Sequence, residues 1–191
     1  MEIIDQFFEG CFLLEARKFK DFRGSFTETF NQKNFNSLIN EKITFVQDNL
    51  SISGKYVFRG IHYQKEPNPQ GKLVSVLNGS VFDVICDLRI GSETFGNHKI
   101  ILLTGDDEKY IWIPKGFGHG FLSMEENTLF SYKVNNYYDP QSDRSINYQD
   151  PQINIDFKDL IGFSQDLLLS EKDKDAPMLD EINPEDLFKI D

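Results

Sequence analysis

The chain has 191 residues, 27% of them charged and 14% aromatic, and its formal net charge is -11. This length suits a single domain with a sizeable core, and the acidic balance argues against nucleic acid or an anionic membrane as a partner, since both require a basic face. No apolar run approaches the roughly 20 residues that span a bilayer, and the first residues lack the cationic and apolar regions of a signal peptide. We therefore expect a soluble, cytoplasmic protein.

Short runs with β-type patterns dominate the chain. In order, strands are predicted at residues 10–18, 45–53, 72–77, 80–88, 99–103, 110–113, 128–134 and 153–155. The dipeptide Asn78-Gly79 between two of these runs is a strong signal for a two-residue hairpin. Only Gln32–Ile39 and a short C-terminal piece have a helical pattern. Many short strands separated by turn residues indicate one all-β sandwich or barrel domain over residues 1–191.

Two segments carry side chains suited to proton transfer. Residues 59–64 include Arg59 and His62, Lys72 follows closely, and residues 113–121 include His119. A histidine titrates near neutral pH, so it can take a proton and return one. A lysine ammonium can stabilise a developing oxyanion, and the planar arginine fork suits a phosphate. Because the chain has only three histidines, two in such segments point to proton-transfer chemistry.

A series of short motifs follows the order of one known family. The motifs lie at residues 22–28, 45–49, 59–64, 70–74, 79–84, 92–96, 113–121, 137–140, 150–151 and 169–173. Each is weak alone, but the collinear set resembles the dTDP-4-dehydrorhamnose 3,5-epimerase family, a branch of the cupin superfamily. The resemblance extends from about residue 10 to 180. It implies a double-stranded β-helix, the cupin jelly roll, with a few short helices and a homodimeric assembly, in agreement with the all-β strand pattern.

The resemblance also implies a substrate and a reaction. The substrate is a dTDP-linked 4-keto-6-deoxyhexose, dTDP-4-dehydro-6-deoxy-D-glucose, and the product is dTDP-4-dehydro-L-rhamnose, in dTDP-L-rhamnose biosynthesis. The C4 ketone acidifies the protons at C3 and C5, and removal of either proton puts negative charge on the C4 oxygen. A base, an oxyanion stabiliser and an acid on the opposite face complete each inversion. No cofactor is required.

The same resemblance assigns the catalytic residues. It makes His62 the base and Asp173 the carboxylate that fixes the tautomer of His62. Lys72 faces the C4 oxygen, and Tyr132 is the proton donor, a role for which a phenol is ready at pH 7. This assignment predicts that the charged segment around Asp173, otherwise a solvated tail, docks beside the active site.

A larger set of polar side chains matches the substrate contacts of the family. Arginines suit a diphosphate because the guanidinium fork meets two oxygens at once. Three positions depart from the usual pattern: Asp143 stands where many relatives have Glu, Gly118 replaces Ala and Ile61 replaces Leu. The predicted substrate contacts are Arg23, Glu28, Gln47, Asp48, Asn49, Arg59, His119, Tyr138, Asp143 and Lys172.

Three alternatives to the double epimerase remain. Many cupins bind a metal through a His-x-His pair, a Glu and a distant His, but Gln64 occupies the place of one histidine and His98 lies in a predicted turn. Two histidines and a glutamine are a poor ligand set for a transition metal, so we expect no metal and regard a dioxygenase as a weak alternative. A single-centre epimerase on a related dTDP-keto sugar would use the same base. A non-catalytic sugar-nucleotide-binding jelly roll would lack the base or the acid.

Overall fold

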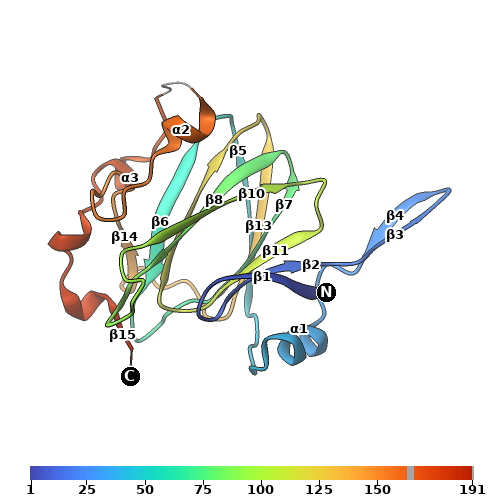
Figure 1. The fold of residues 1–191 in the computed structure, drawn as a ribbon, viewed down its shortest axis with the longest axis horizontal. Helices are drawn as coiled ribbons and strands as arrows, with labels where there is room; N and C mark the ends of the chain where they lie inside the picture. The colour runs from blue at the N-terminus through green and yellow to red at the C-terminus, as the bar shows by residue number, and fades with distance from the viewer. Residues whose placement is uncertain (163–165, 191) are drawn as a thin grey trace.

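The computed structural model describes residues 1–162 and 166–190, and its body consists of two antiparallel sheets packed face to face (Figure 1). The strands are β1 (Glu2–Phe8), β2 (Cys11–Glu15), β3 (Lys18–Asp21), β4 (Gly24–Thr27), β5 (Gln47–Ser53), β6 (Phe58–Gln64), β7 (Lys72–Asn78), β8 (Ser80–Asp87), β9 (Arg89–Ile90), β10 (His98–Thr104), β11 (Lys109–Ile113), β12 (Phe117–Ser123), β13 (Thr128–Val134), β14 (Asp143–Ser145) and β15 (Phe188–Lys189). The helices are α1 (Gln32–Ile39), α2 (Phe157–Ile161) and α3 (Glu171–Lys174), with 3₁₀ turns at Leu179–Glu181 and Pro184–Asp186.

The order of strands in the sheets is that of a jelly roll. One sheet has the order β1-β2-β11-β7-β13-β5, and the other has the order β10-β8-β12-β6-β14. Consecutive strands therefore often lie in opposite sheets, and the sheets enclose a shared interior. The predicted all-β fold, a cupin jelly roll with a few short helices, is confirmed.

The predicted hairpin at Asn78-Gly79 is wrong. β7 and β8 lie in different sheets, so the two strands on either side of this dipeptide do not pair. Gly79 has a φ of +79°, and a Cβ there would lie 2.6 Å from the Thr128 hydroxyl oxygen. The dipeptide does signal a tight change of direction, but here the chain passes from one sheet to the other. Local turn chemistry cannot distinguish that crossing from a hairpin.

Other strand predictions met with mixed success. Residues 153–155, predicted as a strand, instead form part of an irregular connection before α2. β6 and β12, which lie side by side at the centre of one sheet, were not predicted as strands. Both contain glycines, at positions 60, 118 and 120, which lower β-propensity and hide the alternating pattern.

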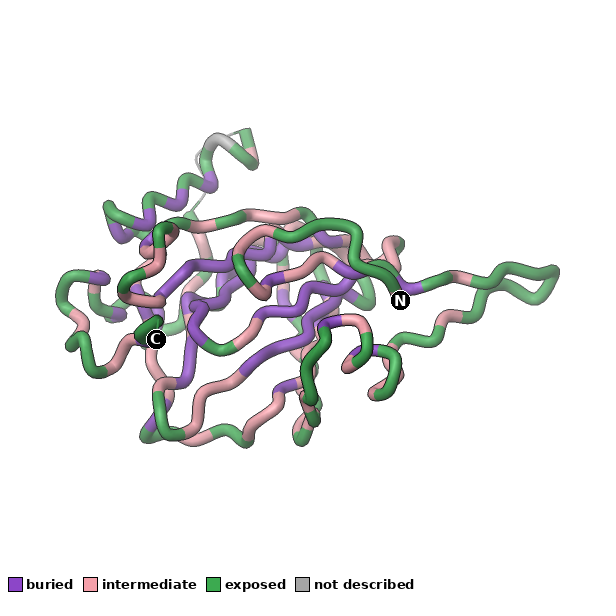
Figure 2. Tube along the Cα trace, turned by 60° about the horizontal axis from the view of Figure 1, so that its bottom comes forward, coloured by how far each residue is buried: buried purple, intermediate pink, exposed green. Residues whose placement is uncertain are grey.

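The interior between the two sheets contains an apolar core. Both sheets contribute fully buried side chains, including Val74 and Phe130 from one and Val81 and Ile85 from the other. Figure 2 shows that buried positions concentrate along these central strands. This interior therefore holds the two sheets together, and Phe121 and Phe130 of the same core also line the cavity described below.

The C-terminal segment covers the outer face of the five-stranded sheet. Leu179 and Phe188 pack with Ile61, Tyr63 and Leu88 in a second apolar core. Further along, the Asp186 carboxylate pairs with Lys65 and Arg144, and β15 pairs in parallel with β9. The chain therefore returns to the sheet after α3, and α3 is fixed in place on both sides.

α1 covers the outer face of the six-stranded sheet. The Asn31 side chain caps its first turn, and the helix ends at Asn40 in the left-handed conformation. Phe35 and Ile39, one turn apart, are its buried residues and pack around Trp112 in a third apolar core. Among residues 1–162 and 166–190, no helix has both the length and the apolar character needed to cross a bilayer.

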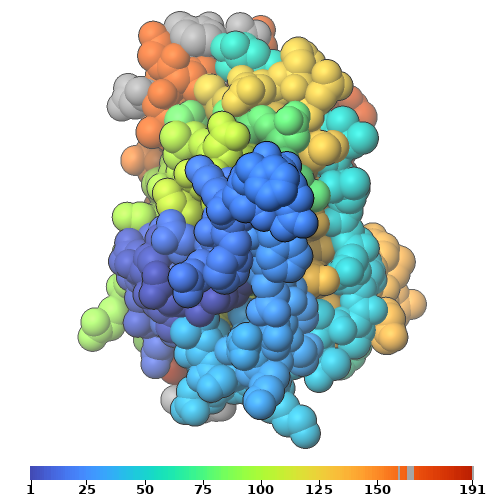
Figure 3. Space-filling view, turned by 90° about the vertical axis from the view of Figure 1, so that its right-hand side faces the viewer, coloured from blue at the N-terminus to red at the C-terminus, as the bar shows by residue number. Residues whose placement is uncertain are grey.

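The β3–β4 hairpin stands out from the body. It projects toward the viewer in Figure 3 and is almost wholly exposed in Figure 2. Three phenylalanines lie on it, and the side chain at its tip, Phe22, is 98% exposed, with Phe19 and Phe26 at least half exposed. Such a group of exposed rings is unusual on a soluble surface and indicates a contact with another molecule.

Candidate active site

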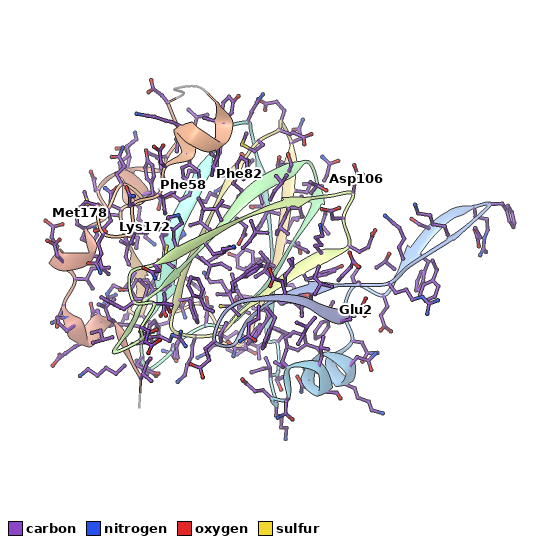
Figure 4. The ribbon with its side chains drawn as sticks, viewed as in Figure 1. Glu2, Phe58, Phe82, Asp106, Lys172 and Met178 are labelled. Carbon is purple, nitrogen blue, oxygen red and sulfur yellow. The ribbon has the colours of Figure 1, made fainter. Side chains whose placement is uncertain are left out.

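A cavity of about 500 Å³ opens between the two sheets, beside α3. Phe58 of β6 and Lys172 of α3 mark this side of the molecule, opposite the β3–β4 hairpin (Figure 4). The cavity is lined from both sheets and from the C-terminal segment, so residues far apart in sequence meet there. Six of the predicted residues contribute to its wall: Arg59, His62, Lys72, His119, Tyr132 and Asp173.

His62 and Asp173 form a close pair across 111 residues of sequence. The Nε2 atom of His62, on β6, lies 2.6 Å from Oδ1 of Asp173, on α3. The Asp173 side chain is buried, whereas His62 is 32% exposed and faces the cavity. Burial alone raises the pKa of Asp173, but the hydrogen bond and charge of His62 outweigh it and hold that pKa below the usual value. An ionised carboxylate therefore holds Nε2–H and leaves Nδ1 free to take a proton.

Lys72 is buried at the start of β7, next to this pair. Its ammonium donates to the backbone oxygen of His62 at 3.2 Å. Burial lowers the pKa of Lys72 to about 8, although the carboxylates of Asp143 and Asp83 act in the opposite direction. The ammonium is thus weakly solvated at neutral pH and is available for a negative oxygen in the cavity.

His119 forms a second histidine–aspartate pair. It lies opposite His62 on the neighbouring strand, and its Nε2 is 2.9 Å from Oδ2 of Asp83. Both side chains are buried, and the His119 ring stacks on Phe130 at a centroid distance of 5.8 Å. Burial lowers the pKa of His119, which Asp83 offsets only in part. A neutral His119 therefore donates to Asp83 and offers its second nitrogen to a ligand.

Tyr132 of β13 and Arg59 of β6 line the cavity from the two different sheets. Burial raises the pKa of Tyr132, with a partial offset from the charge of Arg59, so the phenol carries its proton at neutral pH. Arg59 donates from Nε to the Ser53 hydroxyl at 3.1 Å and from its terminal nitrogen to the Ile52 carbonyl at 3.4 Å. These bonds fix the guanidinium at the cavity wall and leave its other donors for a phosphate.

The three predicted substrate contacts on β5 lie on two different faces of the strand. Alternation along the strand turns Gln47 and Asn49 to its less exposed face, where their side chains bond at 2.8 Å. Asp48 points the other way, is 70% exposed and pairs with Lys133 at 2.8 Å. Asp48 is therefore not brought to the cavity, while Gln47 also accepts from the backbone of Tyr138 at 3.2 Å.

Three further predicted contacts form one cluster beside α3. Lys172 donates to Asp143 at 2.5 Å, and the Tyr138 hydroxyl donates to the same carboxylate at 3.2 Å. Asp143 lies on β14, which pairs with β6, the strand that carries His62, so the cluster stands beside the strand of the proposed base. The structure thus brings these residues together near the cavity.

Arg23 and Glu28 lie away from this cavity. Arg23, in the turn of the β3–β4 hairpin, is exposed and pairs with Asp21, two residues before it, at 2.6 Å. Glu28 accepts from Asn31 and Asn34 at the start of α1, at 3.2 and 3.3 Å. Neither residue contributes to the cavity wall of its own chain.

Asp83 and Ser170 are two of the residues at the site to which the sequence reasoning gave no role. Asp83 could have been found from alternation, because it falls between Val81 and Ile85 on the inward face of β8. Ser170, directly before α3, lines the cavity beside Asp173. Within residues 1–162 and 166–190, no group of three His, Cys, Asp or Glu side chains is arranged to hold a metal ion.

The two facing sheets, with a polar cavity between them that holds a histidine, a lysine and a tyrosine, define a cupin-type jelly-roll enzyme. A profile of the dTDP-4-dehydrorhamnose 3,5-epimerases matches residues 6–181. Enzymes of that name from Salmonella typhimurium and Escherichia coli are 45% and 43% identical to this chain, each over 95% of it and over 97% and 96% of their own lengths. The chain belongs to the dTDP-4-dehydrorhamnose 3,5-epimerase family.

Solved structures agree with this assignment. The dTDP-6-deoxy-D-glucose-3,5-epimerase of Legionella pneumophila, in complex with dTDP-4-keto-L-rhamnose, superposes with a TM-score of 0.93. It is 42% identical, and the match covers 100% of this chain and 98% of that one. A 3'-monoepimerase from Streptomyces bikiniensis, in complex with dTDP, also shares the fold, with a TM-score of 0.85 and 29% identity, over 94% of this chain and 87% of that one.

Proposed function

We propose that the chain catalyses 3,5-epimerisation of dTDP-4-dehydro-6-deoxy-D-glucose to dTDP-4-dehydro-L-rhamnose, in dTDP-L-rhamnose biosynthesis. One observation carries the proposal: the half-exposed His62, bonded to the buried Asp173 at 2.6 Å, shares one cavity with Lys72 and Tyr132. A base with a fixed tautomer, a buried cation and a protonated phenol are the groups that inversion beside a ketone requires. The reaction is redox-neutral, so no electron carrier takes part.

Each inversion follows from these positions. Nδ1 of His62 removes the proton at C3 or C5, and the electron pair moves onto the C4 oxygen as an enolate. The Lys72 ammonium stabilises that oxygen. Tyr132 then gives a proton to the same carbon from the opposite face. The imidazolium loses its proton to water and the phenolate regains one, which restores the site for the second centre.

Isotope exchange tests the proposal. In deuterated water, the wild-type enzyme should convert the substrate to product labelled at both C3 and C5, as read by NMR and mass spectrometry. His62→Ala should abolish both the label and the product while dTDP binding, measured by calorimetry, stays within about threefold. Turnover that survives this substitution would show that His62 is not the base.

The single-centre epimerase is the second candidate, because a 3'-monoepimerase shares this fold. Both reactions use the same base, and the cavity residues do not separate them. The same exchange experiment does: label at only one carbon, with inversion only there, would replace the double epimerase by the single-centre enzyme.

We propose that the enzyme is a homodimer in which the β3–β4 hairpin packs on the second copy. Three exposed phenylalanines on the hairpin support this, as does the position of Arg23, a predicted substrate contact that lies away from its own cavity. Light scattering should give a dimer for the wild type and a monomer for a Phe22→Ser/Phe26→Ser variant. Leu102→Ser is the matched control and should stay dimeric. Leu102 is an apolar residue of β10, and it is about as exposed as Phe19 of the hairpin.

Mixing tests the role of Arg23 in that dimer. If the hairpin reaches the partner's cavity, subunits carrying His62→Ala and subunits carrying Arg23→Ala are each inactive, yet the mixed dimer regains one intact site. Activity should therefore return after the two variants exchange subunits. No recovery, in samples shown to exchange, would place the action of Arg23 within its own chain.

A further inference from the structure

Gln64 is the last residue of β6, two positions after His62, and its side chain is bonded to backbone groups through both its nitrogen and its oxygen. Its Nε2 donates to the carbonyl of Asn68 at 2.6 Å and to the carbonyl of Tyr137 at 3.2 Å. Its Oε1 accepts from the backbone N–H of Asp139 at 2.8 Å. A glutamine amide has two N–H donors, so both are used by the backbone. Gln64 is buried, and the loss of these bonds would leave backbone groups unpaired.

These bonds join two loops, residues 65–71 between β6 and β7 and residues 135–142 between β13 and β14. Two of the bonds lie on either side of one residue, Tyr138, at the carbonyl before it and at the N–H after it. The N–H of Tyr138 itself donates to Oε1 of Gln47, on β5, at 3.2 Å. One glutamine from each sheet therefore fixes the backbone at Tyr138.

The ring of Tyr138 is exposed and is also fixed at its far end. Its hydroxyl donates to Asp143 at 3.2 Å, and Lys172 of α3 donates to the same carboxylate. The ring therefore lies beside the helix that borders the cavity. An exposed aromatic ring with a fixed backbone and a fixed hydroxyl offers a rigid face for stacking a flat ligand. The base of the proposed substrate is a ligand of this kind.

We infer that Gln64 is a positioning residue for nucleotide binding, which fixes the backbone on both sides of Tyr138 and so orients the Tyr138 ring for the base. The inference rests on the proposed function, because the base belongs to the proposed substrate. A side chain that is ordered before binding loses less conformational entropy on binding, and the affinity is correspondingly higher. Because this role involves no reacting atom, its loss should weaken binding without slowing the chemistry.

Gln70 provides a matched control. Its Nε2 donates to the carbonyl of Asn136 at 2.9 Å, so a second glutamine joins the same two loops. This bond lies two residues before Tyr138 and leaves the bonds on either side of Tyr138 intact. A purely structural role for Gln64 predicts that Gln64→Met and Gln70→Met behave alike. A positioning role predicts that only Gln64→Met weakens nucleotide binding.

The experiment measures dTDP affinity by calorimetry, and kcat and KM with the proposed substrate. For Gln64→Met we expect dTDP binding weaker by about tenfold, KM higher by about the same factor, and kcat within about threefold of the wild type. Gln70→Met should lower the melting temperature by a similar amount but keep dTDP affinity within about twofold. Pyrophosphate carries no base, so its inhibition constant should change by less than about twofold in both variants.

A double-mutant cycle with Tyr138→Ala separates the two roles. Once the ring is absent, Gln64→Met should weaken dTDP binding by less than about a further twofold. An equal loss with and without the ring, or wild-type affinity in Gln64→Met, would mean that Gln64 only joins the loops and that the inference is wrong. If Gln64→Met does not fold, Gln64→Asn takes its place in the cycle, because its amide is shorter by one methylene and no longer reaches both neighbours of Tyr138.

The cycle depends on dTDP affinity alone, so it is independent of turnover. If the wild type binds dTDP but shows no exchange at C3 or C5, the proposed function has failed, while the affinities still decide the role of Gln64.

Discussion

The two histidine–aspartate pairs lie opposite each other on adjacent strands, yet they differ in almost every physical respect. His62 is half-buried and takes its carboxylate from α3, a distant part of the chain, whereas His119 is buried and takes its carboxylate from the adjoining strand β8. The same two side chains therefore suit two tasks. The accessible pair can exchange a proton with substrate and water, while the enclosed pair holds His119 as a fixed neutral imidazole.

This contrast predicts that the two carboxylates contribute unequally. Asp173→Asn should lower the exchange rate at C3 and C5 by about 10³-fold, because an amide no longer holds the reactive tautomer. Asp83→Asn should lower it by only about tenfold, because His119 takes no proton in the reaction. Rates of deuterium incorporation, measured beside melting temperatures, check both values. An equal or larger loss in Asp83→Asn would mean that the enclosed pair is the one that transfers the proton.

Tyr132→Phe tests whether His119 is the acid instead. If Tyr132 gives the proton on the opposite face, the variant should still exchange deuterium through His62 but should form at least about 100-fold less inverted product. NMR of the recovered sugar nucleotide distinguishes labelled substrate from labelled product. Normal product formation would assign the final proton to another group of the described cavity wall.

Lys72 acts on both histidine–aspartate pairs. Its ammonium donates to the backbone oxygen of His62, and its charge adds to the burial that lowers the pKa of His119. The ammonium must be protonated to stabilise the enolate, and burial places the pKa of Lys72 at about 8. The rate should therefore fall as pH rises through about 8. Lys72→Met should lower kcat by about 10²-fold and should remove the fall of the rate at basic pH. If the rate of the variant still falls at basic pH, that fall belongs to a different group.

Stability should respond to pH in the opposite direction from the rate, because of the same Lys72 side chain. The unfolded chain binds a proton at Lys72 up to a pKa near 10.5, above the folded value of about 8, so between these values the unfolded state carries more protons. The contribution of Lys72 to the free energy of unfolding thus rises with pH across this window. Lys72→Met should unfold at a higher temperature than the wild type at pH 7, which denaturation curves can check.

Behind the two histidines, Gly118 and Ile61 meet on the outer face of the same strands. A Cβ on Gly118 would lie 2.5 Å from Cγ2 of Ile61. Gly118→Ala alone should therefore destabilise the fold by about 1–3 kcal/mol. Adding Ile61→Leu removes that methyl group and should recover most of the loss, so the two departures from the family pattern are coupled. Additive effects in a double-mutant cycle would contradict this coupling.

The sequence predicted the jelly roll and six residues of the cavity wall, but for two different reasons. Alternation and turn residues were sufficient for strands such as β8 and β13. Asp173 came only from the resemblance, because no local pattern shows that a charged segment returns to a strand 111 residues earlier. Sequence reasoning also could not determine that Asp48 points outward, since one residue of register decides which face a side chain takes.

The features that the sequence did not predict all depend on contacts between segments that are distant in the chain or lie in different chains. β6 and β12 carry the two histidines on glycine-rich strands, where β-propensity is low and tertiary contacts decide the conformation. Whether Asn78-Gly79 links paired strands depends on which sheet each strand joins, and that is a property of the whole fold. Arg23 stands apart from the site of its own chain, so a single chain does not test its predicted contact.

Asp173 follows strands β1 to β14 in the chain, and this order has a consequence for biosynthesis. A ribosome that has made the strands of both sheets has already made the imidazole, the ammonium and the phenol, but not the carboxylate that orients the imidazole. Chemical competence then arises only when the segment beyond β14 packs back onto the five-stranded sheet. Nascent or prematurely terminated chains would accordingly be inert toward the sugar nucleotide even where their barrel is already folded.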